Sequence, residues 1–311
     1  MEKLSVIFAT INDSIATSFT IAQALWQLEQ TEINYEIILV DNGTTDVEKL
    51  NLDNFLDFHK NYPIHYFQFD VKGTIPPHSF GVEKATGKYI MMPDPHIIFS
   101  PDYFEIMLNT LKNLKEKDVE VVFSPFSVGT VVRKNGEYIS ASHLVKPNPF
   151  GRTYSVGESC KFQDKAHPVL SCTISSMVCE KEWMFKIGNM FPEAFKKAGG
   201  HTAESLLVGI PTWMFGKKCY VQPMAVIEHP TYRTYKGEGW SANMHLSMAT
   251  AAYILGGQKY LEDMPSQYGK FVDGDLEEIP EIAKDAREYV EKNAKISLDE
   301  LVENWERIRY E

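Results

Sequence analysis

Residues 84–96 read KATGKYIMMPDPH, a short apolar segment that passes into a polar end. Residues 89–92 are four apolar residues in succession, as is typical of a strand buried on both faces. Asp94 and His96 follow with one residue between them. Positions i and i+2 of an extended chain point to the same side, and Pro95 stiffens the chain between them. We therefore expect both side chains to reach one cation.

The same succession of a strand and a polar end occurs twice upstream. Residues 4–9 (LSVIFA) and 35–40 (YEIILV) are typical of buried strands, and the polar turns after them begin at Thr10 and Asp41. A helical pattern lies between the two strands. Its apolar residues are expected on or near one face: Phe19, Ala22, Leu25, Trp26 and Leu28.

Further strands are predicted at 64–69 and 119–123, and a helix is predicted to begin at Ser100-Pro101 with the serine as N-cap. Strands that alternate with helices favour an α/β domain with a mostly parallel sheet. In open sheets of this kind ligands bind beyond the carboxyl ends of the strands, which is where Asp41 and Asp94 are expected.

The second half of the chain has weaker patterns. Residues 127–175 predict loops and hairpins, and residues 244–256 predict a packed helix. From about residue 275 onward the chain is expected to be helical, with a capping box at Ser297-x-x-Glu300.

Composition limits the classes of function. The 311 residues are 44% hydrophobic and 23% charged, as in a folded globular protein, and no apolar run predicts a membrane span or a signal peptide. The net charge of −11 disfavours a general nucleic-acid or anionic-membrane binder, although a local basic patch stays open. Cysteines 160, 172, 179 and 219 match neither a zinc knuckle nor a disulfide framework. We expect free thiols in a reducing cytoplasm.

The residue types at 94–96 suit a metal site. A nucleotide diphosphate carries negative charge that must be neutralised when a sugar leaves it, by a divalent cation, by Arg or Lys, or by both. A carboxylate with an imidazole suits Mn²⁺, whereas carboxylates alone would also suit Mg²⁺. Asp-x-His alone does not decide the matter, because a plain strand-to-loop transition can carry the same residues.

Three segments in chain order resemble the nucleotide-binding half of family 2-like GT-A glycosyltransferases: SVIFATINDS (5–14), EIILVDNGTTD (36–46) and KATGKYIMMPDPH (84–96). The resemblance implies an α/β fold with a mixed, mostly parallel sheet flanked by helices. It also implies that Thr10 and Asp41 contact the nucleobase and that Asp94 binds the metal. Asp41 has another interpretation, because it can simply cap the turn made with Asn42-Gly43.

Downstream, the chain resembles the polypeptide N-acetylgalactosaminyltransferases, whose metal motif is Asp-x-His. Their Gly-Gly-Glu-Asn-x-Glu segment corresponds to 199–204 (GGHTAE), and a His-x-x-x-Arg pattern follows at 229–233. This resemblance implies that His229 is the third metal ligand and that Arg233 and Tyr235 meet the diphosphate.

The likeness extends over residues 1–255. It divides this GT-A catalytic domain into a nucleotide-binding half (1–125) and an acceptor and metal half (126–255), followed by a helical C-terminal extension (256–311). The sequence has no lectin-like domain, so a peptide acceptor is not implied.

Segment 199–204 departs from the family pattern, because His201 and a threonine replace the first Glu and the Asn, and only Glu204 keeps its place. Glu204 is either a general base that deprotonates an acceptor hydroxyl or the first-turn acid of a helix, and His201 is a rival base. Residues 72–73 and 78–81 lie where related enzymes contact the nucleotide or the donor sugar.

The favoured function is metal-dependent transfer of a hexosyl or N-acetylhexosaminyl group from a nucleotide-diphosphate sugar, with a UDP-sugar as the expected donor, to an unknown hydroxyl acceptor. Whether the anomeric centre is inverted or retained stays open. One alternative is a glycosyltransferase that acts on a modified base of viral DNA. Others are a nucleotide-sugar binding protein and a nucleotidyltransferase on the same fold. The last would carry a Gly-rich loop with Arg or Lys after the first strand, and ATINDS (9–14) has neither.

Overall fold

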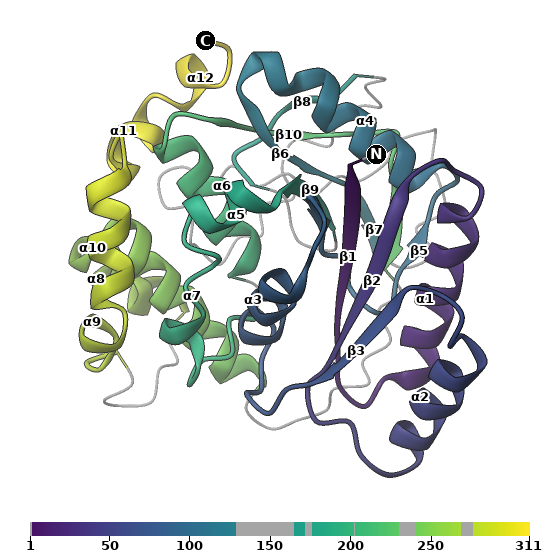
Figure 1. Ribbon diagram of the computed structural model, residues 1–311. Helices are drawn as coiled ribbons and strands as arrows, with labels where there is room; N and C mark the ends of the chain where they lie inside the picture. Colours follow the sequence, from purple (N-terminus) through teal and green to yellow (C-terminus); the bar gives the residue numbers. More distant parts are fainter. Residues whose placement is uncertain (1, 129–164, 172–175, 202, 230–239, 269–275) are drawn as a thin grey trace.

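A computed structural model describes residues 2–128, 165–171, 176–201, 203–229, 240–268 and 276–311 (Figure 1). Within these residues the strands are β1 (Lys3–Thr10), β2 (Asn34–Asp41), β3 (Ile64–Gln68), β4 (Tyr89–Met91), β5 (Ile98–Phe99), β6 (Val119–Phe123), β7 (Phe126–Val128), β8 (His167–Pro168), β9 (Met177–Glu180), β10 (Lys218–Val221) and β11 (Ile227–His229). The α-helices are α1 (Ser14–Leu28), α2 (Asp46–Phe58), α3 (Ile75–Lys84), α4 (Tyr103–Leu114), α5 (Lys181–Lys186), α6 (Glu204–Met214), α7 (Trp240–Gly256), α8 (Gln258–Tyr268), α9 (Ile279–Ile282), α10 (Lys284–Asn293), α11 (Leu298–Glu303) and α12 (Trp305–Ile308). The same described residues also form two short 3₁₀ helices, η1 (Lys115–Lys117) and η2 (Pro192–Phe195).

The described strands form a large mixed sheet in the order β3-β2-β1-β4-β9-β6-β10-β8 and a small sheet in the order β5-β11-β7. In the large sheet β9 is antiparallel to both of its neighbours, β8 is antiparallel to β10, and the other pairings are parallel. The mixed, mostly parallel sheet expected from the sequence is therefore confirmed, with the five predicted strands as β1, β2, β3, β4 and β6. In the β1–β2 register Thr10 pairs with Asp41, which places both at the same carboxyl-end edge.

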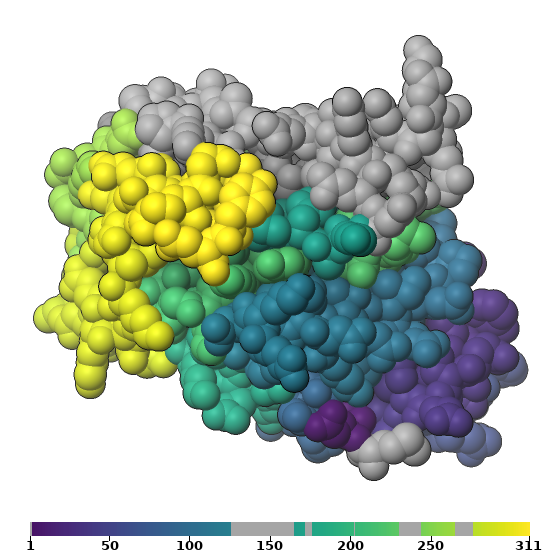
Figure 2. All heavy atoms as spheres, turned by 90° about the horizontal axis from the view of Figure 1, so that it is seen from above, coloured from purple at the N-terminus to yellow at the C-terminus, as the bar shows by residue number. Residues whose placement is uncertain are grey.

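Both faces of the central strands are covered, which explains their continuous apolar sequences. In β1, Leu4, Val6 and Phe8 belong to a core shared with α1 and α4, whereas Ile7 belongs to the core on the other face, shared with α3 and α6. Figure 1 shows α1 and α2 on one side of the sheet and α3, α5 and α6 on the other. Viewed from above, the N-terminal helices and the C-terminal helices lie at opposite edges of the molecule (Figure 2).

The single apolar face predicted for the first helix is wrong. In α1 the side chains of Leu25 and Leu28 are buried, but Phe19 and Trp26 are exposed. At 3.6 residues per turn these two residues project from the side of the helix opposite to Leu28. The helix therefore has two apolar faces, of which only one contacts the core.

The predicted start of α4 is also wrong. The helix begins at Tyr103, after Asp102 in a left-handed conformation (φ 56°). The Ser100 hydroxyl does not cap it and instead accepts a hydrogen bond from Val226 N at 3.0 Å. The serine oxygen therefore bonds a residue far away in the sequence instead of the amides at the start of the helix.

The predicted helices in the last third of the chain are present. α7 includes residues 244–256, and at the start of α11 the Ser297 hydroxyl accepts from Glu300 N at 3.1 Å, as the capping box predicts. Trp305 of α12 is fully buried and packs edge to face on Trp213 of α6, with ring centroids 5.0 Å apart. The end of the chain therefore shares the core of the preceding helices.

The predictions about cysteines, about segment 127–175 and about membrane spans can be compared with the described residues. Cys179 and Cys219 are buried free thiols, as predicted, whereas cysteines 160 and 172 lie outside the described residues, as does most of the 127–175 segment. None of the helices within the described residues combines the length and apolar character needed to cross a bilayer.

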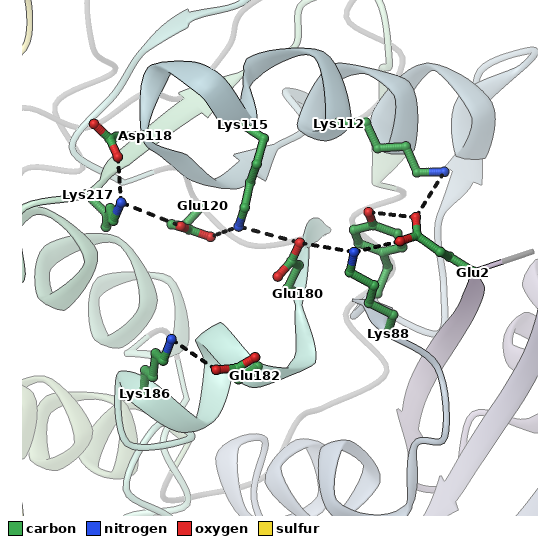
Figure 3. Close-up of polar contacts among 11 residues, drawn as sticks. Glu2, Lys88, Lys112, Lys115, Asp118, Glu120, Glu180, Glu182, Lys186 and Lys217 are labelled. Carbon is green, nitrogen blue, oxygen red and sulfur yellow. Dashed lines mark hydrogen bonds and ion pairs between the residues drawn. The ribbon is translucent and has the colours of Figure 1, made fainter.

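A chain of ion pairs lies along the edge of the sheet opposite to the edge that carries Thr10 and Asp41 (Figure 3). Lys115 links Glu120 and Glu180, and Lys88 links Glu180 to Glu2 near the N-terminus. Glu120 lies in β6, Glu180 in β9 and Lys115 in η1, whereas Lys88 and Glu2 directly precede β4 and β1. Ion pairs with a solvent-accessible lysine contribute little individually, and here they connect parallel and antiparallel strands at one edge.

Glu36 of β2 gives a test of stability against pH. Burial alone would raise the pKa of this carboxyl, which is 1% exposed, but hydrogen bonds from Lys3, Ser5 and Thr86 outweigh it and lower the pKa from 4.5 to about 2. A lowered folded-state pKa contributes stability above pH 4.5 that is lost as the pH falls toward about 2. We expect Glu36→Gln to lose on the order of 2 kcal/mol at pH 7.

Urea unfolding at pH 7 and at pH 3 measures this effect. The difference in unfolding free energy between Glu36→Gln and the parent should shrink at pH 3. At that pH the parent carboxyl takes up a proton when the chain unfolds, which favours the unfolded state. The exposed Glu32→Gln should match the parent at both values. A parent and a Glu36→Gln variant with equal midpoints at pH 7 would contradict the assignment.

Candidate functional site

Three side chains with metal-binding atoms meet beyond the end of β4. Asp94 and His96 lie in the segment between β4 and β5, and antiparallel pairing of β5 with β11 brings the end of β11 beside them. His229 Nε2 lies 3.3 Å from Asp94 Oδ2 and 3.2 Å from His96 Nε2. One ligand atom of each residue lies within 4.8 Å of the other two, so a single cation can contact all three.

Asp13 orients one of these histidines. Its Oδ2 accepts a hydrogen bond from His96 Nδ1 at 3.0 Å, which leaves Nε2 of the same ring facing His229. A carboxylate that holds the distal nitrogen of a ligating histidine is a common arrangement in metal sites. Sequence reasoning missed Asp13; the sequence signalled only that a carboxylate lies in the polar loop at the carboxyl end of β1.

The charges of the cluster support one another. Burial by itself raises the pKa of Asp94, but the hydrogen bond with His229 and the charge of His96 outweigh it, so the pKa is lowered. Burial lowers the pKa of His96, and the bond to Asp13 and the charge of Asp94 outweigh this and raise it. The site thus holds Asp94 as a carboxylate, the form that a cation requires.

Helix α1 holds the segment that follows His96. The Thr20 hydroxyl donates to Ile97 O at 2.9 Å, and Gln23 exchanges two bonds with the backbone of Phe99. Gln27 bonds the carbonyl of Ser100 and the amide of Tyr103 in the same way. These side chains satisfy buried backbone groups of an irregular segment, which keeps the metal motif in place.

The two residues expected at the nucleobase are adjacent and buried. Thr10 Oγ1 shares a 2.7 Å hydrogen bond with Thr17, and Asp41 accepts from Thr44 N at 2.8 Å and from Tyr66 at 2.6 Å. Asp41 therefore does cap the turn after β2, which was the alternative interpretation. A carboxylate has further acceptor sites, so a contact with a base stays a prediction.

The loop before α6 packs on the start of α3. Both Thr74 N and Ile75 N donate to Gly199 O, at 2.7 and 3.1 Å. A side chain at Gly73 would lie 2.3 Å from that same oxygen, so the two loops can approach this closely only with glycine there. His201 follows this contact by two residues, and the charge of Asp94 acts on it.

Two neutral histidines border the cluster. His78 on α3 is 6% exposed, and its Nε2 atom has no hydrogen-bond partner. Burial lowers the pKa of both His78 and His201, and the charge of Asp94 only partly opposes this. Sequence reasoning placed residues 78–81 near the donor but could not find the unpartnered nitrogen, because burial is a property of the fold.

Of the remaining predicted residues, the structure describes Glu204 only. Glu204 is 6% exposed and is the first residue of α6, so the structure agrees with the first-turn acid and leaves the base interpretation open. Arg233 and Tyr235 lie outside the described residues.

The chain matches the model of a known family. The family model of Glycosyl transferase family 2 matches residues 5–164. This range begins in β1 and includes the Asp94 and His96 motif.

Parts of this chain are also similar to curated relatives. An uncharacterized glycosyltransferase from Rickettsia felis is 31% identical over 152 residues, which is 45% of this chain and 24% of the relative. One from Rickettsia conorii is 31% identical over 142 residues, 45% of this chain and 21% of the relative. One from Haemophilus influenzae is 33% identical over 82 residues, 26% of this chain and 32% of the relative. The matched stretches thus cover about a third or less of the relatives' own length.

Two solved structures share the fold. A crystal structure of GalNAc-T7 with UDP, GalNAc and Mn²⁺ has a TM-score of 0.65 at 15% identity, covering 100% of this chain and 57% of that one. The mannosyltransferase PcManGT from Pyrobaculum calidifontis, in complex with GDP-Man and Mn²⁺, has a TM-score of 0.51 at 13% identity, covering 94% of this chain and 74% of that one. At these identities the likeness establishes the fold, which is the GT-A fold predicted from the sequence.

Proposed function

Because the chain belongs to glycosyl transferase family 2, we propose that it transfers a sugar from a nucleotide-diphosphate sugar to a hydroxyl acceptor with a divalent cation at Asp94, His96 and His229. The observation that carries the proposal is the convergence of these three ligand atoms within 4.8 Å at the carboxyl end of β4. A carboxylate with two imidazoles suits Mn²⁺, with Mg²⁺ as the alternative. Both structural neighbours were solved with Mn²⁺.

A UDP-sugar is the proposed donor. The neighbour that covers the whole chain holds UDP, and the other holds GDP-Man. Thr10 and Asp41, side by side at the edge of the sheet, are proposed to contact the base. Arg233 and Tyr235 are proposed to meet the diphosphate, as the sequence resemblance implies.

The chemistry needs charge neutralisation at the leaving group. A bound cation would supply it by sharing the negative charge of the diphosphate. Asp94 and the two histidines would hold that cation, and Asp13 would fix the ring of His96. His78 and His201, kept neutral by burial, can hydrogen-bond uncharged sugar hydroxyls without adding charge.

The central test uses a panel of nucleotide sugars with and without Mn²⁺. Hydrolysis of the donor and its effect on the melting temperature are measured together, since hydrolysis can be slow without an acceptor. We expect one UDP-sugar to raise the melting temperature only when the metal is present. If no nucleotide sugar binds in the presence of metal, the proposed function fails.

Asp13 gives a prediction about metal affinity. Asp13→Asn keeps the shape of the side chain but removes the charge that orients His96, so Mn²⁺ affinity should fall by about 10- to 100-fold. Isothermal titration with Mn²⁺ alone measures the change without any assumption about the sugar. The exposed Asp57→Asn should bind like the parent, and an unchanged affinity in Asp13→Asn would contradict the positioning role.

Glu204 is proposed as the base that takes the proton of the acceptor hydroxyl, with His201 as the rival. If Glu204 acts so, Glu204→Gln should lower kcat by about 10²- to 10⁴-fold with little change in donor affinity. The melting temperature separates the alternatives. A variant with a lowered melting temperature and an unchanged kcat would assign Glu204 to the helix terminus alone.

A further inference from the structure

Helix α1 exposes a stripe of large apolar side chains on the face directed away from the core. Ile15, Phe19 and Trp26 are 72%, 59% and 66% exposed. With 3.6 residues per turn, their positions fall within about 40° of one another around the helix axis. A helix that is apolar on two opposite faces is normally covered on both.

Helix α2 continues this surface. Val47, Leu50 and Phe58 are 68%, 59% and 82% exposed, and all three project away from the side of the helix that buries Leu52. α1 and α2 pack side by side on one face of the sheet, and no described helix or strand lies outside them (Figure 1). The α1/α2 apolar face is defined by these residues: Ile15, Phe19, Trp26, Val47, Leu50 and Phe58.

The six side chains together expose more apolar area than the largest patch of an ordinary monomer. At the exposures above, three aromatic side chains and three aliphatic ones leave on the order of 700 Å² of apolar area open. The largest apolar patch on a typical monomer is about 300–600 Å². A standard protein interface covers about 800 Å² on each partner.

The uncharged surface of α1 favours a second copy of this chain as the occupant of the face. The fifteen residues of α1 include no charged side chain, so two copies of α1 can meet without like-charge repulsion. A two-fold axis across α1 would run the two helices antiparallel, with their dipoles opposed. Exposed Asp53 and Asp57 on α2 disfavour an anionic membrane as the occupant.

We propose that the α1/α2 apolar face is a dimer interface between two copies of this chain, centred on α1. The interface does not depend on the metal site or on the proposed function. It lies on the outer side of the helix whose inner side holds residues 97–103 with Thr20, Gln23 and Gln27. Dimerisation would therefore cover the outer side of α1 and leave these inner contacts in place.

Sedimentation velocity of the full chain over a range of concentrations tests this proposal. The parent should sediment as a species of twice 35.5 kDa. Phe19→Glu and Trp26→Glu should each weaken the dimer by at least about 30-fold, because a buried charge would replace a central apolar contact. Both side chains are exposed in one copy, so circular dichroism should show an intact fold.

Tyr310→Glu is the matched control, since Tyr310 is 72% exposed but lies on the C-terminal segment at the opposite edge of the molecule. It should leave the dimer unchanged. A parent that stays monomeric at every concentration overturns the proposal, and so does a dimer that persists in both glutamate variants. A monomer that binds phosphatidylcholine vesicles through Trp26 would assign the face to a lipid surface and also overturn it.

Discussion

Asp94→Ala is expected to lower metal-dependent turnover of the donor by about 10³-fold or more. The variant removes the carboxylate of the three-residue cluster, and a cation is worth several kcal/mol of transition-state stabilisation. Each 1.4 kcal/mol corresponds to a factor of ten in rate. The measurement is kcat/KM for donor hydrolysis at saturating Mn²⁺, beside the shift in melting temperature that nucleotide and metal produce together.

Two further variants make the result specific. Asp94→Asn keeps the size of the side chain and loses its charge, so it should resemble the alanine variant if metal binding is the cause. The exposed Asp57→Ala changes the net charge equally and should behave like the parent. Metal-dependent turnover that survives in both Asp94 variants would remove Asp94 from the site, and with it the proposed mechanism.

The strands could be predicted from the sequence because of where they lie. A strand buried on both faces is apolar along its length, and β1, β2 and β4 are such strands. Their polar ends then mark the ligand-binding edge of a parallel sheet, which is how Asp41 and Asp94 were predicted. Thr10 was predicted only through the resemblance to a family.

The completion of the metal cluster could not be derived from local pattern. His229 reaches Asp94 because β11 pairs with β5, and a pairing between residues more than 120 positions apart leaves no local signal. Only the resemblance to a family pointed to it. Asp13 was missed for a related reason: its loop has several polar residues, and the fold alone decides which of them faces His96.

The first helix was predicted as a helix but with the wrong face. Apolar periodicity identifies a buried face only when the opposite face is polar, and α1 is apolar on both. The error and the proposed dimer therefore have the same cause. A side chain such as Trp26, which the core does not use, satisfies the pattern equally well when it is covered by another chain.

Trp305→Ala is expected to destabilise the protein by about 3–5 kcal/mol, a large part of the stability of a typical domain. Trp305 is 0% exposed and its ring packs against Trp213 of α6. Its removal would therefore leave a cavity in the core. If the C-terminal helices were a loosely attached extension, this change would affect only their own ends. If they complete the core, it should lower the melting temperature of the whole chain by about 10 °C.

Trp305→Phe separates packing from hydrogen bonding. The indole Nε1 is buried without a hydrogen-bond partner, so its removal should cost nothing in bonding, and the loss should be only about 1 kcal/mol of contact. Tyr310→Ala, five residues further on and exposed, should stay within about 0.5 kcal/mol of the parent.

Urea unfolding followed by far-ultraviolet circular dichroism measures all three variants. A single transition that moves to lower urea only in the Trp305 variants would show that α12 and the sheet unfold together. A Trp305→Ala variant that unfolds at the same urea concentration as Tyr310→Ala would instead make the C-terminal helices energetically separate from the domain that carries the metal cluster.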